Sequence, residues 1–284
     1  MTASDVRILP VTTEAQRKEF ARFLWQIYRD DPLWVPPIFQ DHMALLTPGK
    51  HPFWEHAEQQ LFLARRDYEL VGTICAHVNH RHNEIHEDKV GFFGFFEVLD
   101  DQAVADALFE AASGWLREQG MEAIRGPENP SQNEEVGLLI DGFHLPRVIM
   151  MSYNPTYYRD LVEGAGFQKA QDLYAWDILT SIFDLDVQKL PRKFLRVAEQ
   201  ARQRPNVVIR PLDMKNFDAD VELAKAVYNQ AWEKNWGFVP FTDHEIEHLA
   251  QGLKMILDSD LIYFALVDGK PAGVSLSVPD VNQA

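Results

Sequence analysis

The chain has 284 residues, 46% of them hydrophobic and 25% charged, a composition typical of a globular protein long enough for two domains. Its 43 acidic and 27 basic side chains give a formal net charge of −16, which disfavours nucleic acid and anionic membranes as partners. The single cysteine, Cys75, excludes an intrachain disulfide. The sequence shows no secretory signal and no membrane-spanning run, so it predicts a cytoplasmic protein without membrane partners.

The N-terminal elements alternate between strand and helix. Val6–Val11 predicts a short strand, and Glu14–Tyr28 predicts an amphipathic helix because its large apolar residues recur at helical spacing. Leu61–Gly72 predicts a strand, a tight turn and the start of a second strand, which continues to Asn79. A polar turn is expected after Asn79.

The next elements complete a first α/β module. Val90–Val98 predicts an apolar strand, and Ala103–Gln119 predicts a helix that ends at a glycine. A further strand is expected within Met121–Pro130 and a helix within Tyr153–Phe167. Lys169–Ile178 is predicted to close the module as a strand.

Histidines and glutamates cluster between residues 77 and 87: His77, His80, His82, His86, Glu84 and Glu87. Neutral imidazoles close together can hold zinc, but this spacing matches no established zinc pattern. Solvated or strand-capping histidines account for the same residues, and we expect no metal. His77, on the strand itself, is either a base that faces a cleft or a half-buried side chain with satisfied polar atoms.

Two stretches of the sequence repeat at one offset. Val6–Val11 (VRILPV) is matched by Val207–Leu212 (VVIRPL), and Leu61–Gly72 is matched by Ile262–Gly273. Both matches are displaced by 201 residues, and in both copies the first strand precedes a helical pattern. The sequence therefore predicts a duplicated α/β module.

The expected domain organisation follows from this repeat. Residues 1–179 are predicted to form a complete module, residues 180–206 a linker helix, and residues 207–284 the first half of a second module. Pro191 suits the first turn of the linker helix and Pro205 its end. A basic helix that binds nucleic acid is the alternative, but the net charge argues against it.

The order of elements in the first module resembles the GNAT superfamily of acyl-CoA-dependent N-acyltransferases, and in particular bacterial proteins with two such modules in tandem. The resemblance covers the first module fully and the second in part, and it includes the segment from Asn154 to Gly166-Phe167. It implies an α/β fold with a mixed, mostly antiparallel sheet flanked by helices, followed by a partial second copy. It also implies acetyl-CoA or another acyl-CoA as cosubstrate and a small-molecule amine as acceptor.

The turn that binds the CoA pyrophosphate in the GNAT pattern is altered in this sequence. Glycines in the family pattern allow backbone N–H groups at a helix N-terminus to reach the phosphates. The corresponding residues, Val98–Ala103, contain no glycine and carry Asp100 and Asp101. One of these aspartates is expected to cap the following helix and to occupy the anion site. The first module is therefore predicted to be degenerate for CoA binding.

Polar residues cluster where the resemblance implies entry of the acceptor: Asn129, Ser131, Asn133, Glu134 and Glu135. Glu134 and Glu135 are candidate general bases for an amine, acting directly or through water. Asn129 and Asn133 are candidate substrate-binding residues. The alternative is turn chemistry, in which such residues fill a loop for backbone reasons.

Two aromatic positions complete the candidate site. Tyr157, with Tyr158 beside it, is a candidate general acid, because Val162 stands where many GNAT relatives have tyrosine. Tyrosines at a helix start also commonly pack with a wet hydroxyl. Trp236 is a candidate wall of the substrate slot and equally a lid on the core.

The sequence thus predicts an acyl-CoA-dependent N-acyltransferase, similar to acetyltransferases, with an unknown amine substrate. A non-catalytic GNAT-fold module for ligand binding or assembly is the alternative, and aminoacyl-tRNA-dependent transfer is a third reading that the net charge disfavours. By the repeat, the remaining strands of the second copy would lie beyond Ala284. An open sheet edge at Pro271–Val278 is then expected to favour self-association.

Overall fold

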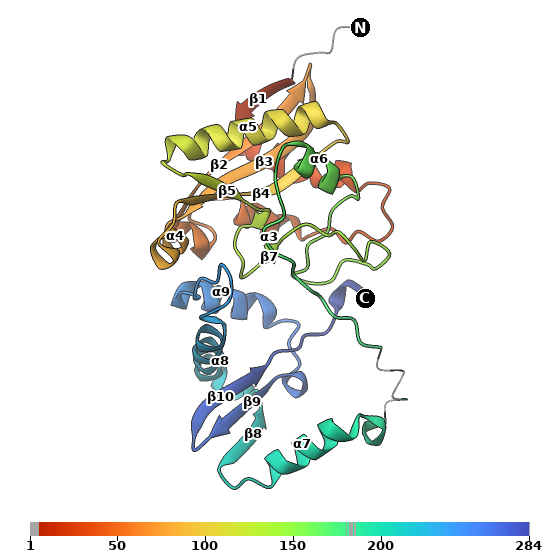
Figure 1. Ribbon diagram of the computed structural model, residues 1–284, viewed down its shortest axis with the longest axis vertical. Coiled ribbons are helices and arrows are strands. Elements are labelled where there is room, and N and C mark those ends of the chain that lie inside the picture. The colour runs from red at the N-terminus through yellow and green to blue at the C-terminus, as the bar shows by residue number, and fades with distance from the viewer. Residues whose placement is uncertain (1–5, 180, 182–183, 185, 284) are drawn as a thin grey trace. The chain divides into compact units, whose positions relative to one another are not determined.

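The computed structural model describes residues 6–179, 181, 184 and 186–283 and divides the chain into two units (Figure 1). Unit 1 extends to Lys169 and also includes Asn235–His248 and residues from Asp280 onward, whereas unit 2 comprises Ala170–Lys234 and Leu249–Pro279. The boundaries expected from the sequence do not include this return of the chain to unit 1. Residues 1–5, 284 and several positions of the expected linker (180, 182, 183 and 185) lie outside the described residues.

A five-stranded sheet forms the centre of unit 1 (Figure 1). Neighbouring strands are antiparallel except for the parallel pair β4–β5. In sheet order the strands are β1 (Val6–Pro10), β2 (Ala57–Arg66), β3 (Glu69–Asn79), β4 (Val90–Val98) and β5 (Ala123–Arg125). The predicted mixed, mostly antiparallel sheet is confirmed.

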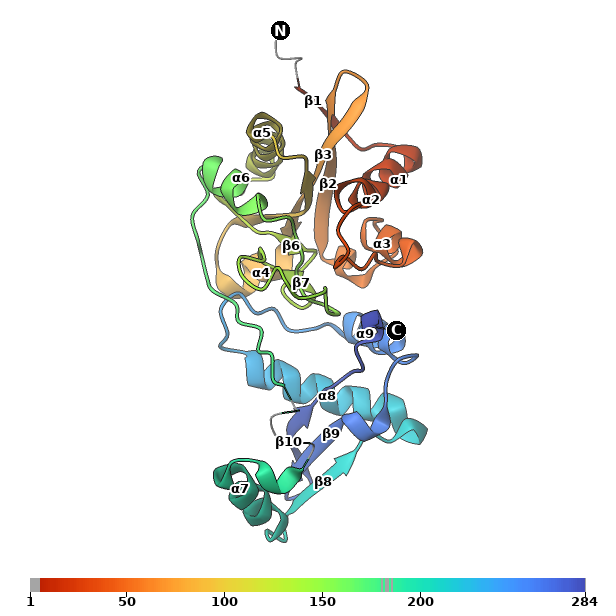
Figure 2. The ribbon, with the colours of Figure 1, turned by 90° about the vertical axis from the view of Figure 1, so that its right-hand side faces the viewer.

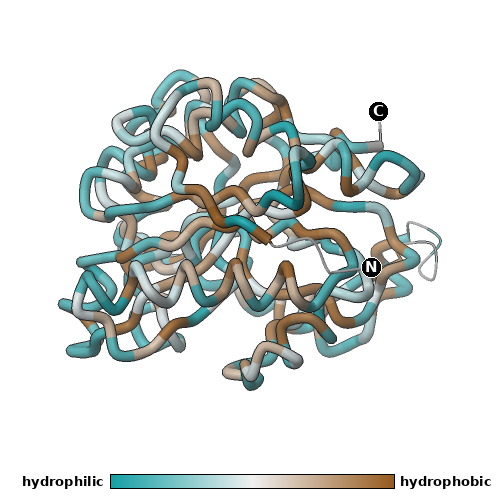
Figure 3. Tube along the Cα trace, turned by 90° about the horizontal axis from the view of Figure 1, so that it is seen from above, coloured by the Kyte–Doolittle hydropathy of each residue, from teal (hydrophilic) through white to brown (hydrophobic). Residues whose placement is uncertain are grey.

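Helices cover both faces of this sheet (Figure 2). On one face lie α1 (Glu14–Arg22), α2 (Leu24–Ile27) and α3 (Phe39–Leu45), and on the other lie α5 (Gln102–Glu118) and α6 (Tyr158–Gly164). Strand side chains alternate between the two faces, so each face buries its own apolar cluster. The hydropathy colouring shows apolar stretches in the inner part of the trace and mostly polar turns at its periphery (Figure 3).

Neighbouring residues on β3 illustrate this alternation. Ile74 joins the cluster under α5 with Leu108, and Cys75 joins the cluster under α1 with Phe20. Cys75 is fully buried, and burial raises the pKa of its thiol. The cysteine is therefore a core residue and not a reactive group.

The polar turn expected after Asn79 is wrong, because this segment forms a helix, α4 (His80–His86). The side chain of Asn79 caps the helix by accepting a hydrogen bond from His82 N at 3.1 Å. The helix ends at Glu87, whose backbone is left-handed with φ 52°. Since Asn79 also ends β3, the strand pattern conceals the cap in the sequence.

The closing strand expected at Lys169–Ile178 is also wrong, because this stretch has no regular secondary structure and pairs with no described strand. Its apolar side chains are exposed, including Trp176 at 85%. A strand needs a neighbour for its backbone N–H and C=O groups. On the side of β4, the edge strand of the unit 1 sheet is β5, which has only three residues and offers a short ladder.

Unit 2 is built on a three-stranded antiparallel sheet in the order β10-β9-β8. The strands are β8 (Val207–Pro211), β9 (Tyr263–Val267) and β10 (Lys270–Ser275), as predicted for the second copy. Helix α8 (Phe217–Trp232) packs against this sheet through Leu223 and its neighbours. Trp232 lies at the end of α8 and is 47% exposed.

Further short elements complete the chain. They are the helices α7 (Arg192–Arg202) and α9 (Asp243–Leu253), the two-stranded sheet of β6 (Glu128–Asn129) and β7 (Glu135–Val136), and the 3-10 helices at Pro52–Glu55, Val187–Lys189, Met214–Asn216, Ser259–Leu261 and Val281–Gln283. Helix α7 lies in the predicted linker and buries no residue. No helix in the described part of the chain is long and apolar enough to cross a bilayer.

The strand registers confirm the duplication. Val6 pairs with Arg66 in unit 1, and Val207 pairs with Val267 in unit 2, so both partners are displaced by 201 residues. The second ladder agrees, because Arg66 pairs with Glu69 and Val267 pairs with Lys270. Unit 2 therefore repeats the first three strands of unit 1 in their order and register.

Candidate functional site

Strand β4 carries a bulge in its C-terminal half. Its pairing with β3 shifts between Cys75–Gly94 and Thr73–Glu97, and the bulged Phe95 has a left-handed backbone with φ 46°. The N–H of Phe95 donates to Asn129 Oδ1 at 2.6 Å. Asn129, a predicted substrate-binding residue, therefore uses its side chain to hold the loop after β5 against β4.

Two glycines allow this close approach of the loop to β4. A Cβ atom on Gly94 would lie 1.7 Å from Glu128 O, and a Cβ atom on Gly126 would lie 2.3 Å from Phe93 O. Neither position has space for a side chain, so glycine is required at both. The contact fixes the place of Glu128 beside the middle of β4.

Glu97 lies near the end of β4 in contact with tyrosine hydroxyls. Its Oε2 accepts a hydrogen bond from Tyr158 OH at 2.7 Å, and the same hydroxyl accepts from Val98 N at 2.9 Å. Tyr157 OH donates to Val98 O at 2.8 Å. Burial raises the pKa of Tyr157 above its usual range. Tyr157, the predicted general acid, thus lies at the end of β4 with its hydroxyl proton on a backbone carbonyl.

Burial also changes the acidity of Glu97. It raises the pKa of this carboxyl group to about 7, although hydrogen bonds from Tyr158 and Tyr28 act in the opposite direction. The positive charge of Arg147 lowers the pKa as well, and the negative charge of Glu135 raises it. Glu97 therefore changes its charge close to neutral pH.

The N-terminus of α5 is closed by its own cap. Asp101 Oδ1 accepts hydrogen bonds from Ala103 N at 3.0 Å and from Val104 N at 3.3 Å, and Oδ2 pairs with Arg66 at 2.7 Å. The prediction that Asp100 or Asp101 caps this helix is confirmed, and Asp101 is the capping residue. An anion can reach these N–H groups only if Asp101 moves away.

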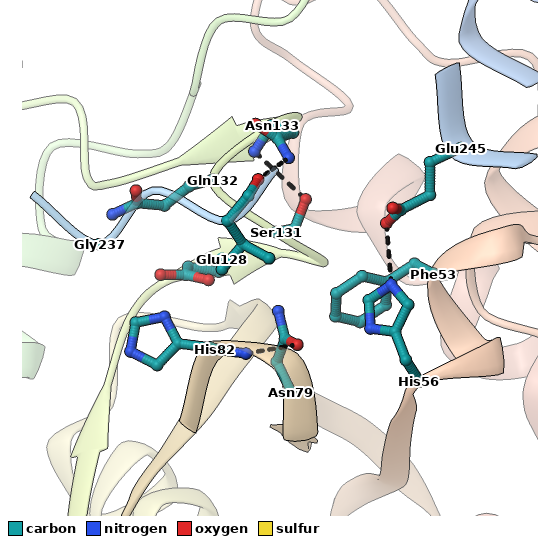
Figure 4. A pocket seen from close by; sticks show the side chains of 11 residues that line it. Phe53, His56, Asn79, His82, Glu128, Ser131, Gln132, Asn133, Gly237 and Glu245 are labelled. Carbon is teal, nitrogen blue, oxygen red and sulfur yellow. Dashed lines mark hydrogen bonds and ion pairs between the residues drawn. The ribbon is translucent and has the colours of Figure 1, made fainter. Parts of the chain in front are cut away.

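A small polar cavity lies within unit 1 (Figure 4). Its volume of about 10 Å³ is enough for roughly one water molecule. Asn79, His82 and Glu128 lie on one side, and His56 and Glu245 lie on the other. The remaining lining residues are Phe53, Ser131, Gln132, Asn133, Gly237 and Val239.

Of the two carboxyl groups that line this cavity, that of Glu128 has the fewer partners to stabilise its ionised form. The residue is 4% exposed, and among the described residues its carboxylate has no hydrogen bond and no ion pair. Burial raises its pKa to about 8, and the charge of Arg125 offsets only part of this effect. Glu128 is therefore largely protonated at neutral pH and would ionise next to a cation.

A histidine–carboxylate pair forms the opposite wall. His56 Nε2 lies 3.1 Å from Glu245 Oε1, and Glu245 Oε2 accepts hydrogen bonds from the backbone and hydroxyl of Thr242, both at 2.8 Å. The two hydrogen bonds from Thr242 thus hold the carboxylate of Glu245 in place at the start of α9. The buried His56 Nδ1 has no hydrogen-bond partner within the described residues.

The predicted bases Glu134 and Glu135 do not line the cavity. Glu134 Oε1 lies 3.1 Å from His51 Nε2, and Glu135 forms an ion pair with Arg147. Burial raises the pKa of Glu134, and His51 lowers it in part. Their roles as bases stay predictions, but each carboxylate already has a partner.

Asn133 and Trp236, the other predicted substrate-binding residues, lie close to the cavity. Asn133 lines it, and its Nδ2 donates to Val239 O at 2.9 Å. Trp236 stacks under the guanidinium of Arg125, 4.7 Å from the ring centroid. Trp236 precedes the lining residue Gly237, so it lies at the border of the cavity.

The histidine cluster divides between the core and helix α4. His77 is fully buried, stacks on Phe92 with centroids 5.5 Å apart, and has its pKa lowered to about 3 by burial. His82 lines the cavity, and burial lowers its pKa to about 4 although Asp88 acts in the opposite direction. Both rings are therefore neutral at physiological pH. No group of three or more possible metal ligands occurs in the part of the chain that the structure describes.

Sequence reasoning missed the two carboxyl groups with the most changed acidity, Glu97 and Glu128. Glu97 had a visible signal, because it is the only charged residue in the strand VGFFGFFEV, in which every residue is buried. Glu128 had no such signal, because it lies between two prolines in a stretch typical of a turn. Its burial depends on Gly94, a contact 34 residues away in sequence.

The fold agrees with the one predicted from the sequence. A mixed sheet with one parallel pair, helices on both faces and a partial second copy make up a GNAT-like fold. No protein-family model matches the sequence. Among solved structures, a tandem GNAT protein from the clavulanic acid biosynthesis pathway is similar with a TM-score of 0.48 and 11% identity, over 95% of this chain and 73% of that one.

Two relatives are much more similar in sequence. The bacterial ceramide synthase of Caulobacter vibrioides is 39% identical over 285 residues, which cover 100% of this chain and 72% of the relative. Protein YghO of Escherichia coli is 34% identical over 267 residues, which cover 94% of this chain and 66% of the relative. The chain belongs to the same family as the Caulobacter ceramide synthase.

Proposed function

We propose that this chain takes part in the N-acylation of a long-chain amine, with an acyl-CoA as acyl donor and with unit 1 as the module that binds the amine. The name of the Caulobacter relative describes synthesis of a ceramide, which is the amide of a fatty acid and a long-chain amino alcohol. The observation that carries the proposal is Glu128, a buried carboxyl group without an ion-pair partner at a polar cavity.

The acidity of Glu128 suits proton transfer from an amine. An ammonium group beside Glu128 would favour the carboxylate and lower its pKa, so that on binding the carboxyl group loses its proton to solvent. The carboxylate can then accept a proton from the ammonium and leave a nucleophilic amine. The amine nitrogen attacks the thioester carbonyl carbon, the new C–N bond forms, and the C–S bond breaks. The sulfur leaves as the CoA thiolate, and it takes up the proton that the nitrogen loses as the amide forms.

The acyl donor is proposed to bind away from the α5 turn of unit 1. In unit 1, an acyl-CoA would be expected to contact three groups of backbone N–H hydrogen-bond donors. Side chains of this chain already accept hydrogen bonds from all three groups. Asn129 accepts from Phe95 N, Tyr158 accepts from Val98 N, and Asp101 accepts from the first N–H groups of α5. Each would have to be released before a thioester or a pyrophosphate could use these donors.

Calorimetry with a long-chain amino alcohol tests the amine site. We expect the wild-type chain to bind it, and Glu128→Gln to weaken binding at least tenfold because the neutral amide cannot pair with the ammonium group. Glu122→Gln is the matched control, since Glu122 is exposed and pairs with Lys89 on the surface. Equal affinities for wild type and Glu128→Gln would contradict the proposal.

The second candidate function is a non-catalytic module that binds the amine. It is favoured by the same side chains that occupy the donors of β4 and α5. Mass spectrometry after incubation with a fatty acyl-CoA and the amine distinguishes the two functions. Amide formation that falls at least 100-fold in Glu128→Gln supports transfer, whereas amine binding without amide supports the binding module.

A further inference from the structure

Six of the exposed large apolar side chains of unit 1 lie in two short segments. Five belong to the loop 139–151, which we call the apolar loop, and a sixth lies in the segment 33–38. The six are between 38% and 65% exposed: Ile38, Ile140, Leu145, Val148, Met150 and Met151. Isolated exposed apolar residues are ordinary, but several of them in neighbouring segments indicate a contact with an apolar phase or another molecule.

The apolar loop is held at its base and along its side. Buried Asn154 accepts a hydrogen bond from Leu139 N at 2.7 Å and donates to Leu139 O at 3.2 Å, which closes the loop. Arg147 ties it to the second segment, because its N–H donates to Leu33 O at 3.3 Å and its Nη1 to Val35 O at 3.4 Å. The two segments therefore lie next to each other, and we call their six exposed side chains the apolar surface.

This surface lacks the charges that an anionic membrane attracts. Residues 33–38 (LWVPPI) contain no ionisable side chain, and the apolar loop contains only Asp141, His144 and Arg147. The charge of Arg147 is compensated by its ion pair with Glu135. The chain net charge of −16 also disfavours attraction to anionic lipid headgroups as the source of binding. The surface fits neutral or zwitterionic lipid, where burial of apolar side chains supplies the affinity.

The apolar loop is continuous with the candidate site. Two residues separate it from the end of β7, and the segment before β7 supplies Ser131 and Asn133 to the polar cavity. Arg147 of the loop is close enough to lower the pKa of Glu97. A molecule held at the apolar loop would thus lie near Glu97, on a segment that leads from the polar cavity.

We propose that the apolar loop and Ile38 dock on the surface of a zwitterionic lipid bilayer, so that a lipid amine enters the site while its alkyl chains remain in the bilayer. The choice of a lipid partner rests on the proposed function. The proposed docking differs from the expectation of no membrane partner. That expectation considered only membrane-spanning segments and electrostatic attraction to lipid headgroups.

Flotation of the full chain with phosphatidylcholine vesicles tests this docking. We expect the wild type to float with the vesicles, and to do so equally at low and high salt because no charge attraction is involved. The double variant Ile140→Asp, Met151→Asp should reduce the bound fraction at least tenfold. The matched control is Tyr68→Asp, Ile85→Asp, which changes two exposed apolar residues of unit 1 outside the surface by the same charge.

Several outcomes would overturn the proposal. These are absence of wild-type flotation, loss of flotation at high salt, or equal flotation of the two double variants. A milder pair, Ile140→Ser and Met151→Ser, should lower flotation in the same direction and serves if the aspartates impair folding. Dissociation of a dimer by these substitutions, without vesicle binding by the wild type, would assign the surface to a second copy. Vesicle binding does not depend on amine binding by Glu128, so failure of the proposed function is separately visible.

Discussion

Asp101 occupies the position at which a GNAT module would offer free N–H groups. Its two hydrogen bonds and its ion pair with Arg66 make the cap a stabilising contact as well as an obstacle to anions. Asp101→Ala should lower the free energy of unfolding by about 1 kcal/mol. Asp100→Ala is the control, because its neighbour Asp101 makes the capping bonds. Urea unfolding measures both, and equal losses for the two variants would contradict this role.

Glu97 makes stability depend on pH. Its ordinary pKa of 4.5 is raised to about 7 in the folded chain, so the folded state holds this proton more tightly than the unfolded state. The contribution is fully present below about 4.5 and is lost as the pH rises through about 7. The chain should therefore become less stable across this window.

Glu97→Gln tests the assignment, because an amide oxygen still accepts the Tyr158 hydrogen bond and does not titrate. The melting temperature of the variant should exceed that of the wild type by more at pH 8 than at pH 5. Scanning calorimetry across this range, with Glu122→Gln as an exposed control, measures the difference. A pH profile with the same slope in Glu97→Gln and the wild type would show that Glu97 does not titrate in this window.

At the scale of elements, the contact between β4 and the loop after β5 fixes the candidate site. Gly94→Ala should push the loop away from the strand, because its Cβ would meet Glu128 O at 1.7 Å. We expect a loss of several kcal/mol in unfolding free energy and of amine binding. Gly114→Ala, inside α5 with nothing within 4 Å, should instead stabilise the chain by about 0.5–1 kcal/mol. Thermal unfolding of both variants compares them, and similar effects would contradict the contact.

Strands with strong local patterns could be predicted from the sequence. The apolar runs of β3 and β4 and the helical spacing of α5 specify their elements locally. Local pattern alone could not decide whether Lys169–Ile178 forms a strand, because a strand forms only where a neighbouring strand supplies hydrogen bonds. Helix α4 was missed because one residue, Asn79, ends a strand and caps a helix at once.

The candidate site was predicted less well than the fold. The cap at Asp101 depends only on residues beside it in sequence, and it was predicted. Glu128 depends on burial by segments far apart in the chain, including Gly237 and Glu245. The acidity of a carboxyl group follows from its surroundings after folding, so residue type and spacing could not distinguish Glu128 from Glu134.

At the scale of the whole molecule, the sheet of unit 2 ends at β10, which pairs only with β9 among the described strands. Its outer edge leaves backbone groups open to another chain, although Pro271 and the irregular pairing near it weaken such a contact. We expect concentration-dependent self-association by light scattering. Ser275→Lys places a charge on this edge and should reduce it, and an unchanged association constant would exclude β10 as the contact.

The equal registers of the two copies have a consequence for folding, since they make exchange of strands between the copies possible. β1 (VRILP) and β8 (VVIRP) share valine, isoleucine and proline at corresponding positions, so either strand fits either partner without a slip. Misassembly of this kind is a known hazard of repeated modules. What distinguishes them is Arg210, whose counterpart in β1 is Leu9: in unit 2 it pairs with Asp220, which is 2% exposed, at 2.7 Å. β1 in the place of β8 would leave this buried carboxylate without its cation, so one ion pair penalises the exchanged fold.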